Sequence, residues 1–211
     1  EKDVVGVYIS GHPLDDFKTE MKSFTNCKVS DFNDMEGLIN RRLSFGGIVS
    51  NVQYRTTRRG EEFTIFTIED YEDSFEFAIF SEENLKYRHL INENQTLYFM
   101  VSVKEGWTNR KTGKKGKPKV MYHQIQLLNT VLKSQSKKIT VQIPIEELAE
   151  EKIEGLKALF ETHKGDKQLH FLVYELKEKI KINMPSRKQK IDISNELIEE
   201  LEKTDFKYKL N

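Results

Sequence analysis

The chain has 211 residues, of which 37% are hydrophobic, and its 34 basic residues balance 34 acidic ones. It contains no apolar run near the roughly 20 residues that a membrane-spanning helix requires, so we expect no membrane contact. Its one cysteine, Cys27, excludes a disulfide framework and favours a reducing, cytoplasmic compartment. The length leaves room for one large domain or two small ones.

Residues 1–42 form the first predicted segment, a partly helical lead-in rather than a domain. Its His12-Pro13 pair predicts a tight turn that His12 braces. The nearby Asp15 and Asp16 could suggest a metal site, but the five histidines of the chain show none of the close spacings that build zinc sites. We therefore expect neither a metal nor another cofactor.

Residues 43–132 carry the pattern of a five-stranded barrel. The first strand, 43–57, is rich in β-branched and aromatic residues, and its Gly46-Gly47 pair predicts a bulge or sharp bend that lets one strand serve two sheets. The other four predicted strands are 62–70, 75–80, 96–103 and 119–128. A predicted helix, 82–91, lies between the third strand and the fourth. Three strands, a helix and two strands are the order of an OB-fold, a small all-β barrel.

Two loops of this barrel are cationic. TTRRGEE (56–62) joins strands one and two, and residues 104–119, with seven cations and one acid, join strands four and five. An OB-fold binds oligonucleotides with these two loops and with the face of strands two and three. A charge run alone is most often a solvated loop, but this position favours binding of single-stranded DNA, whose phosphates need cations and whose bases stack on aromatic rings. The candidate binding residues are Arg58, Arg59, Phe66, Trp107, Arg110, Lys111, Lys114, Lys115, Lys117 and Lys119.

For the aromatic members of that set the pattern alone leaves two roles open, base stacking and core packing. In the second strand, Phe63, Ile65 and Phe66 compete for the inner face, and we place Phe66 among the outward rings. Core packing is the commoner role for any one of these aromatic side chains. Trp107 is the exception, because it lies inside a polar loop.

A family resemblance lies in the first seventeen residues, EKDVVGVYISGHPLDDF. They resemble the segment of the bacterial DNA polymerase III alpha subunit that precedes its OB domain. The matching positions are Gly6, Tyr8, Ser10, Gly11, His12, Pro13, Leu14 and Asp15. The stretches GGIVSNV, TTRRGEEF and FTIEDYEDSFEFAIF follow in that family's order, so the resemblance covers residues 1–130. Two departures are Asp73, where the family's second turn usually has glycine, and the longer lysine-rich loop.

A second domain is predicted after a polar linker at 133–137. Residues 138–211 read as a strand, a helix, two strands and a helix, so the complete fold class is an all-β OB-fold barrel followed by a small α+β domain (β-α-β-β-α). Ile153, Leu156, Leu159 and Phe160 form the apolar stripe of its first helix. Asp192 or Ser194 is expected to cap the second.

The resemblance implies a partner for this tail, the tau subunit of the clamp loader. The candidate contact residues are Leu197, Leu201, Phe206, Tyr208 and Leu210. Packing of the same residues on the domain's own sheet is an equally good interpretation.

The sequence offers no catalytic constellation. Polymerase chemistry needs carboxylates that hold two metal ions, but the acidic cluster at 69–73 lies in a hairpin and is explained by turn chemistry. We therefore expect the non-catalytic C-terminal region of a DNA-directed DNA polymerase, with 1–42 leading in from a preceding polymerase domain that carries the nucleotidyltransferase chemistry. The alternatives are a protein-interaction module with little intrinsic DNA binding and a tRNA-binding OB appendage of a synthetase-like enzyme.

Overall fold

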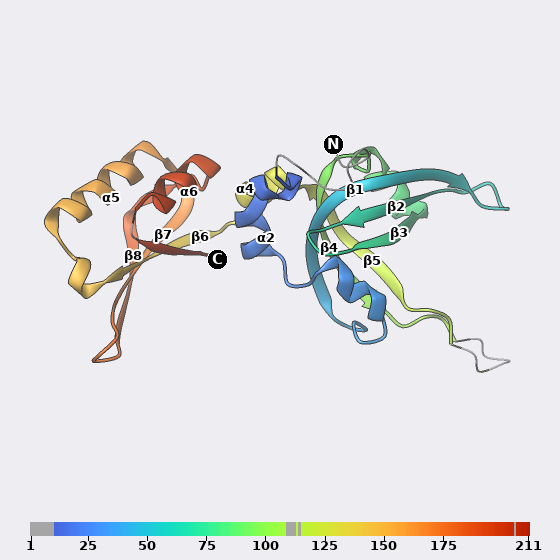
Figure 1. Ribbon diagram of the computed structural model, residues 1–211, viewed down its shortest axis with the longest axis horizontal. Helices are drawn as coiled ribbons and strands as arrows, with labels where there is room; N and C mark the ends of the chain where they lie inside the picture. Colours follow the sequence, from blue (N-terminus) through green and yellow to red (C-terminus); the bar gives the residue numbers. More distant parts are fainter. Residues whose placement is uncertain (1–10, 109–112, 114, 205) are drawn as a thin grey trace. The chain divides into compact units, whose positions relative to one another are not determined.

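The computed structural model describes residues 11–108, 113, 115–204 and 206–211. They form the predicted OB-fold barrel followed by an α+β region (Figure 1). The chain divides into two compact units, Glu1–Val131 and Leu132–Asn211. We call them the barrel unit and the tail unit.

The barrel unit is built on one antiparallel five-stranded sheet. In sheet order its strands are β3 (Ser74–Phe80), β2 (Glu62–Glu69), β1 (Arg42–Thr56), β4 (Thr96–Lys104) and β5 (Lys119–Leu127). Helix α3 (Ser81–Tyr87) and the short 3-10 helix η3 (Arg88–Leu90) connect β3 to β4. Within the described residues β3 and β5 form no ladder with each other, so the barrel is partly open, as OB-folds are.

Strand β1 serves both halves of the barrel because it changes partner in its middle. It pairs with β4 up to Ile48 and with β2 from Ile48 onward, and its curvature is visible in Figure 1. The glycine pair comes just before this change. A Cβ on Gly47 would lie only 2.3 Å from Ile68 Cγ2 of β2, and one on Gly46 would lie 2.5 Å from a sulfur atom. The prediction that this strand serves both halves of the barrel is confirmed, and the irregularity in its pairing with β2 lies just after the glycine pair, between Val49 and Asn51.

Aromatic rings fill the barrel. Phe45 of β1 stacks on Phe99 of β4 and on Phe77 of β3, with ring centroids 4.8 and 5.3 Å apart. Phe66 of β2 joins this stack and is 1% exposed. Because side chains on a strand alternate between its faces, Phe66 inside the barrel puts Phe63 on the outside.

The lead-in packs into the same core. It consists of the 3-10 helix η1 (Pro13–Phe17), helix α2 (Lys18–Phe24) and the 3-10 helix η2 (Val29–Asp34). Val29 and Phe32 are 0% and 1% exposed and belong to the hydrophobic core of the barrel. At the start of η1, Nδ1 of His12 accepts a hydrogen bond from the N–H of Leu14 at 3.1 Å, which confirms the bracing role predicted for His12.

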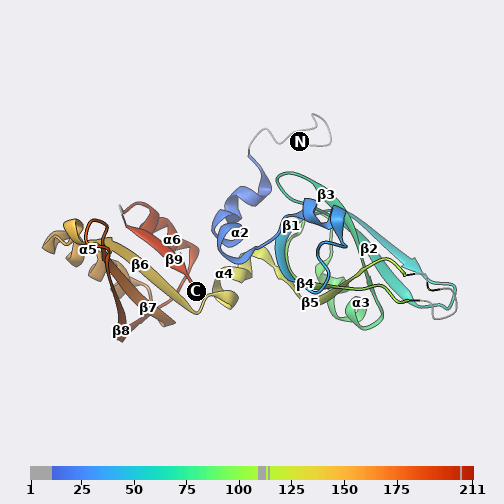
Figure 2. The ribbon, with the colours of Figure 1, turned by 90° about the horizontal axis from the view of Figure 1, so that it is seen from below.

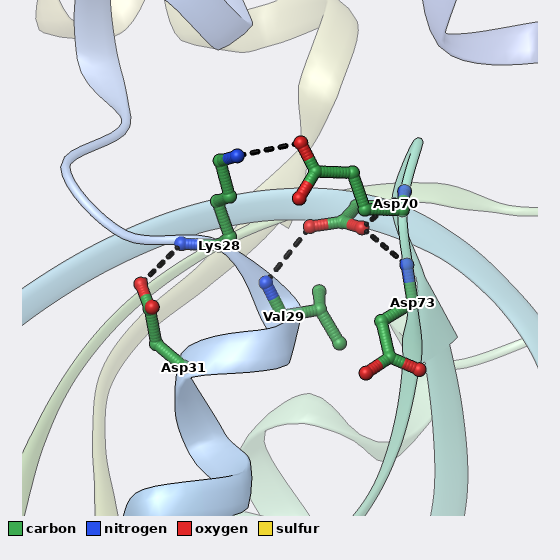
Figure 3. Close-up of polar contacts among 6 residues, drawn as sticks. Lys28, Val29, Asp31, Asp70 and Asp73 are labelled. Carbon is green, nitrogen blue, oxygen red and sulfur yellow. Dashed lines mark hydrogen bonds and ion pairs between the residues drawn. The ribbon is translucent and has the colours of Figure 1, made fainter.

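A buried carboxylate fixes the lead-in to the turn between β2 and β3 (Figure 3). Asp70 is 7% exposed, and one of its oxygens accepts a hydrogen bond from the N–H of Val29 at 2.8 Å. Its other oxygen accepts from the N–H groups of Glu72 at 2.9 Å and Asp73 at 3.0 Å. Lys28 adds an exposed ion pair with Glu72 at 2.5 Å. The acidic cluster is therefore explained by turn chemistry, as the sequence predicts.

The tail unit is a four-stranded sheet with two main helices. In sheet order its strands are β8 (Ile180–Ile191), β7 (Lys164–Glu175), β6 (Lys138–Pro144) and β9 (Lys207–Leu210). Strands β6 and β7 are parallel, and the other two pairs are antiparallel. The principal helices of the tail unit are α5 (Glu150–Thr162) and α6 (Asn195–Glu202), and η5 (Ile145–Glu147) is a short one. Two further short helices, η4 (Leu128–Thr130) and α4 (Val131–Gln135), lie where the chain passes from the barrel unit to the tail unit.

Helices α5 and α6 cover one face of this sheet (Figure 1). Phe160 of α5 packs edge-on against Phe171 of β7, with ring centroids 5.9 Å apart. The cap of α6 is Ser194, whose Oγ accepts the N–H of Leu197 at 3.3 Å. Two features differ from the sequence prediction. The last residues form the extra strand β9, too short to show a period, and β8 continues past Pro185, which an edge strand tolerates.

Candidate nucleic-acid interface

The β1–β2 hairpin carries the first cationic loop. Thr57 closes this loop, since its N–H donates to the C=O of Glu61 at 2.8 Å and its Oγ1 accepts the N–H of Glu61 at 3.1 Å. Gly60 takes a φ of +84°, which favours glycine. Arg58 and Arg59 are left at the tip of the hairpin with exposed side chains.

The β4–β5 loop leaves the barrel as a narrow two-armed ribbon. The N–H of Gly116 donates to the C=O of Trp107 at 2.9 Å. At Gly106 the arms approach so closely that a Cβ would lie 2.1 Å from the carbonyl oxygen of Gly116. Trp107 is 72% exposed, so its ring is accessible to a ligand.

The six predicted binding cations of this second loop divide into two groups of three. Lys115, Lys117 and Lys119 are exposed, and Lys115 forms an ion pair with Glu105 at 3.7 Å. Three other predicted binding residues lie outside the part of the chain that the structure describes: Arg110, Lys111 and Lys114.

The two loops project from the same end of the barrel. Figures 1 and 2 both show the β1–β2 hairpin and the described arms of the β4–β5 loop extending in one direction, and in Figure 1 strands β2 and β3 lie between them. This is the arrangement in which an OB-fold holds an oligonucleotide across strands two and three.

One predicted aromatic contact is wrong. Phe66 is 1% exposed, and its ring lies 5.9 Å from that of Phe77 and 6.0 Å from that of Phe99 inside the barrel. A base can stack only on a ring face that solvent reaches, so Phe66 cannot bind DNA in this structure.

The outer face of β2 and β3 offers a different aromatic pair. Phe63 of β2 lies opposite Phe80 of β3, and their rings stack with centroids 5.1 Å apart. Phe80 is 44% exposed. On the other side of Phe63 the cross-strand neighbour is Arg55 of β1, which is exposed and donates to Gln53 at 2.5 Å. The row Arg55–Phe63–Phe80 therefore combines a cation with a stacking surface, which sequence alternation indicates only once Phe66 is known to face inward.

A groove of about 720 Å³ follows the open seam between β3 and β5. Its lining includes Phe80, Lys119 and the three carboxylate residues Glu76, Glu82 and Glu83. Glu83 accepts a hydrogen bond from the N–H of a strand β5 residue at 2.9 Å. These carboxylates disfavour a phosphate beside them, so the cationic surface for a polyanion is limited to the two projecting loops, with Lys119 where the second loop enters β5, and the row of Arg55.

The described residues contain no group of three or more His, Cys, Asp or Glu side chains placed to hold a metal ion. Burial and the nearby charge of Asp31 raise the pKa of Cys27 to about 12, so its reactive thiolate is scarce at neutral pH.

The partner contacts predicted in the tail are mostly wrong. Leu197, Leu201, Phe206 and Leu210 are between 0% and 7% exposed, because they form the core between the helices and the sheet. Tyr208 is half-buried, and its hydroxyl donates to Glu202 at 2.9 Å. The large exposed apolar side chains of the tail lie elsewhere, and those on the β7–β8 hairpin are Leu176, Ile180, Ile182 and Met184.

Comparison with known proteins gives the family. Residues 139–211 match the family model described as DNA polymerase III alpha subunit, C-terminal domain. The DNA polymerase III subunit alpha of Halalkalibacterium halodurans is 25% identical over 203 residues, which cover 96% of this chain and 17% of that protein. The chain is homologous to the C-terminal region of DNA polymerase III alpha subunits. The family resemblance seen in the sequence is confirmed.

A second bacterial alpha subunit shows how small this region is. The DNA polymerase III subunit alpha of Borreliella burgdorferi is 31% identical over 98 residues, which cover 46% of this chain and 8% of that protein. The chain thus spans less than a fifth of the length of either relative. Among the residues that the structure describes, no helix has the length and apolar character needed to span a membrane.

Similarity to solved structures is weak. A Replication Protein A heterotrimer bound to ssDNA has a TM-score of 0.30 at 12% identity, covering 63% of this chain and 29% of that chain. A Leishmania major protein described as an aspartyl-tRNA synthetase has a TM-score of 0.33 at 10% identity, covering 58% of this chain and 22% of that chain. Scores this low carry no argument about function.

Proposed function

We propose that the barrel unit binds single-stranded template DNA as part of the non-catalytic C-terminal region of a bacterial replicative polymerase. One observation carries this proposal. Two loops with exposed cations project from the same end of the barrel, with β2 and β3 between them. The stacked pair of half-buried Phe63 and exposed Phe80 lies on the outer face of those strands.

The chemistry of binding follows from these side chains. Arg58 and Arg59 on one loop and Lys117 and Lys119 on the other neutralise phosphates and release counterions. Bases stack on Trp107 and on the Phe63–Phe80 pair, and each stacked base contributes about 1–3 kcal/mol. Stacking does not read sequence, so we expect little base preference.

Nucleotidyl transfer is proposed to lie in other parts of the full-length protein. The alpha subunit relative that aligns with most of this chain is far longer, with only 17% of it covered. In this proposal the chain is not itself an enzyme. It acts in the cytoplasm within the replisome, joined to the remainder of the polymerase chain.

The test is a binding titration read by anisotropy and by quenching of the single tryptophan. A labelled single strand of about 20 nucleotides exceeds the site size of an OB-fold and is compared with its duplex and with tRNA. We expect saturable binding of the single strand with quenching of Trp107, and weaker binding of the duplex. No binding at low salt would favour a pure protein-interaction module, and a strong preference for tRNA would favour a synthetase-like appendage.

The tail unit is proposed to dock on the tau subunit of the clamp loader, as the family resemblance implies. Because the four predicted leucine and phenylalanine contacts are buried, we assign this docking to the β7–β8 hairpin. Ile180, Ile182 and Met184 are 43–49% exposed and, at alternate positions of β8, share one face. This row is an apolar edge of the kind that binds a partner protein.

Surface plasmon resonance with the purified tau subunit tests this assignment. Ile182→Asp should weaken binding at least tenfold, about 1.4 kcal/mol. Leu85→Asp, at an 84% exposed position of the barrel unit, is the matched control and should leave binding unchanged. Equal affinities for the two variants would remove the β7–β8 hairpin from the interface.

A further inference from the structure

Helices α5 and α6 lie on one side of the tail sheet, and among the described residues of the tail unit no helix covers its other face (Figure 1). Phe171 of β7 faces helix α5, so its neighbours His170, Leu172 and Tyr174 face the opposite side. The register extends this alternation to the other strands, where Lys181 lies beside Tyr174 and Lys209 lies two strands from His170. We call this side of the four strands the open face.

Charge is segregated between the two sides of the tail unit. The helical segments η5, α5 and α6 contain ten glutamates and two lysines. The open face of the paired strands contains five lysines and, at its paired positions, no aspartate or glutamate. The lysines are Lys138, Lys181, Lys190, Lys207 and Lys209. A unit with nearly equal numbers of acids and bases thus presents one cationic side.

The lysines of the open face are available to a ligand. Lys181, Lys207 and Lys209 are exposed, and in the part of the chain that the structure describes none of their ammonium groups forms an ion pair. Lys207 and Lys209 point the same way from one strand, about 7 Å apart along it. The half-buried rings of His170 and Tyr174 lie between the two lysine-bearing edge strands.

We propose that the open face of the tail sheet binds the phosphate backbone of DNA, as a contact separate from the barrel. Lysine is depleted from protein–protein interfaces but supplies phosphate contacts. The face is also polar rather than apolar, with one leucine, Leu172, among the side chains of its central strands. Lysines on edge strands also discourage sheet aggregation, and a change in the salt dependence of DNA affinity is the readout that separates the two roles.

The experiment compares two charge-matched triple variants of the full chain. The face variant carries Lys181→Gln, Lys207→Gln and Lys209→Gln. The control variant carries Lys133→Gln, Lys157→Gln and Lys177→Gln, all at exposed positions away from the open face. Affinity is measured by anisotropy across a salt series, with a labelled single strand and with its duplex. Circular dichroism verifies that both variants are folded.

Loss of three phosphate contacts should reduce the slope of log affinity against log salt by about 2 for the single strand, from roughly 0.7 per contact. The control variant should change it by much less. Equal slopes for the two variants with both probes would overturn the proposal. It is also overturned if the face variant keeps its DNA slope but loses binding to poly(glutamate), which would assign the face to an acidic protein.

This inference stands apart from DNA binding by the barrel. We call the barrel variant with four substitutions on its two cationic loops the hairpin variant: Arg58→Gln, Arg59→Gln, Lys117→Gln and Lys119→Gln. Adding the three face substitutions to it should reduce the salt slope again, by about as much as they reduce it in the parent chain. If the hairpin substitutions change nothing while the face substitutions do, the barrel proposal fails and the open face stands. The reverse result overturns the open face alone.

Discussion

The barrel unit and the tail unit use the two sides of a sheet in different ways. The barrel curls its sheet around an aromatic core, so its cations stand on two loops that extend beyond the strands. The tail keeps its sheet open and covers one side with acidic helices, so its cations lie flat on the other side. In both units the proposed DNA contacts lie away from the core, so the choice of inner and outer face decides which residues can reach DNA.

The largest expected effect separates the two faces of β2. Phe66→Ala removes a ring from the barrel core and should lower the free energy of unfolding by about 3–5 kcal/mol. Phe63→Ala, on the outer face of the same strand, should lower it by less than about 1 kcal/mol. Urea unfolding of both variants measures the difference. Similar losses would mean that β2 does not present these faces as described.

The second contrast is between two anchors of the lead-in. Asp70→Ala leaves the N–H of Val29 without its partner and should cost about 2–3 kcal/mol, because hydrogen bonds to a charged, buried acceptor are lost. Lys28→Ala removes only an exposed ion pair and should cost under about 1 kcal/mol. Thermal unfolding of the two variants ranks the anchors, and a larger loss for Lys28→Ala would reverse our account of the junction.

The third contrast concerns the aromatic pair on the outer face. Phe80→Ala should weaken single-strand binding by about 1–3 kcal/mol while leaving the salt slope unchanged, because stacking releases no counterions. Anisotropy titrations at two salt concentrations provide both values. Leu85→Ala, an exposed apolar truncation outside this face, is the control. A changed salt slope for Phe80→Ala would show that the aromatic pair affects the contacts to the DNA phosphates rather than base stacking.

The smallest expected effect compares two buried carboxylates of the barrel unit. Asp70 is fully hydrogen-bonded, whereas Glu20 of α2 is 1% exposed and its Oε1 has no hydrogen-bond partner within the described residues. Burial raises the pKa of Glu20 above its ordinary value. A raised carboxyl pKa means that the folded state binds the proton more tightly, so stability falls as pH rises through the interval between the unfolded and folded pKa values.

Glu20→Gln should therefore raise the free energy of unfolding by about 1 kcal/mol at pH 7. The gain should vanish below about pH 4, where the carboxyl is protonated in both states. Urea unfolding at the two pH values tests this. A gain that persists at low pH would point to packing rather than ionisation.

Much of the fold is readable from the sequence because its signals are local. Strand alternation, the change of partner along the first barrel strand and the position of the helix before β4 are set by neighbouring residues, and these predictions are confirmed. The role of His12 is likewise set within three residues.

The errors have one physical origin. A period of two shows that Phe63 and Phe66 face opposite sides, but the sequence does not show which side closes onto Phe77 and Phe99. The apolar residues of the last helix similarly look alike whether they pack inward or face a partner. Which face is buried depends on long-range contacts. Those contacts therefore determine which aromatic residues of the barrel unit are accessible to a base and which apolar residues of the tail unit are accessible to a partner.

The most direct test of the account is the salt dependence of single-strand binding by the parent chain and the hairpin variant. Lys22→Gln, Lys133→Gln, Lys157→Gln and Lys177→Gln together form a charge-matched control at exposed positions. If the loops hold the DNA backbone, the hairpin variant should lose about 3 from the slope of log affinity against log salt, from roughly 0.7 per contact, while the control stays close to the parent. Coincident slopes for the hairpin variant and the parent would contradict DNA binding by the barrel.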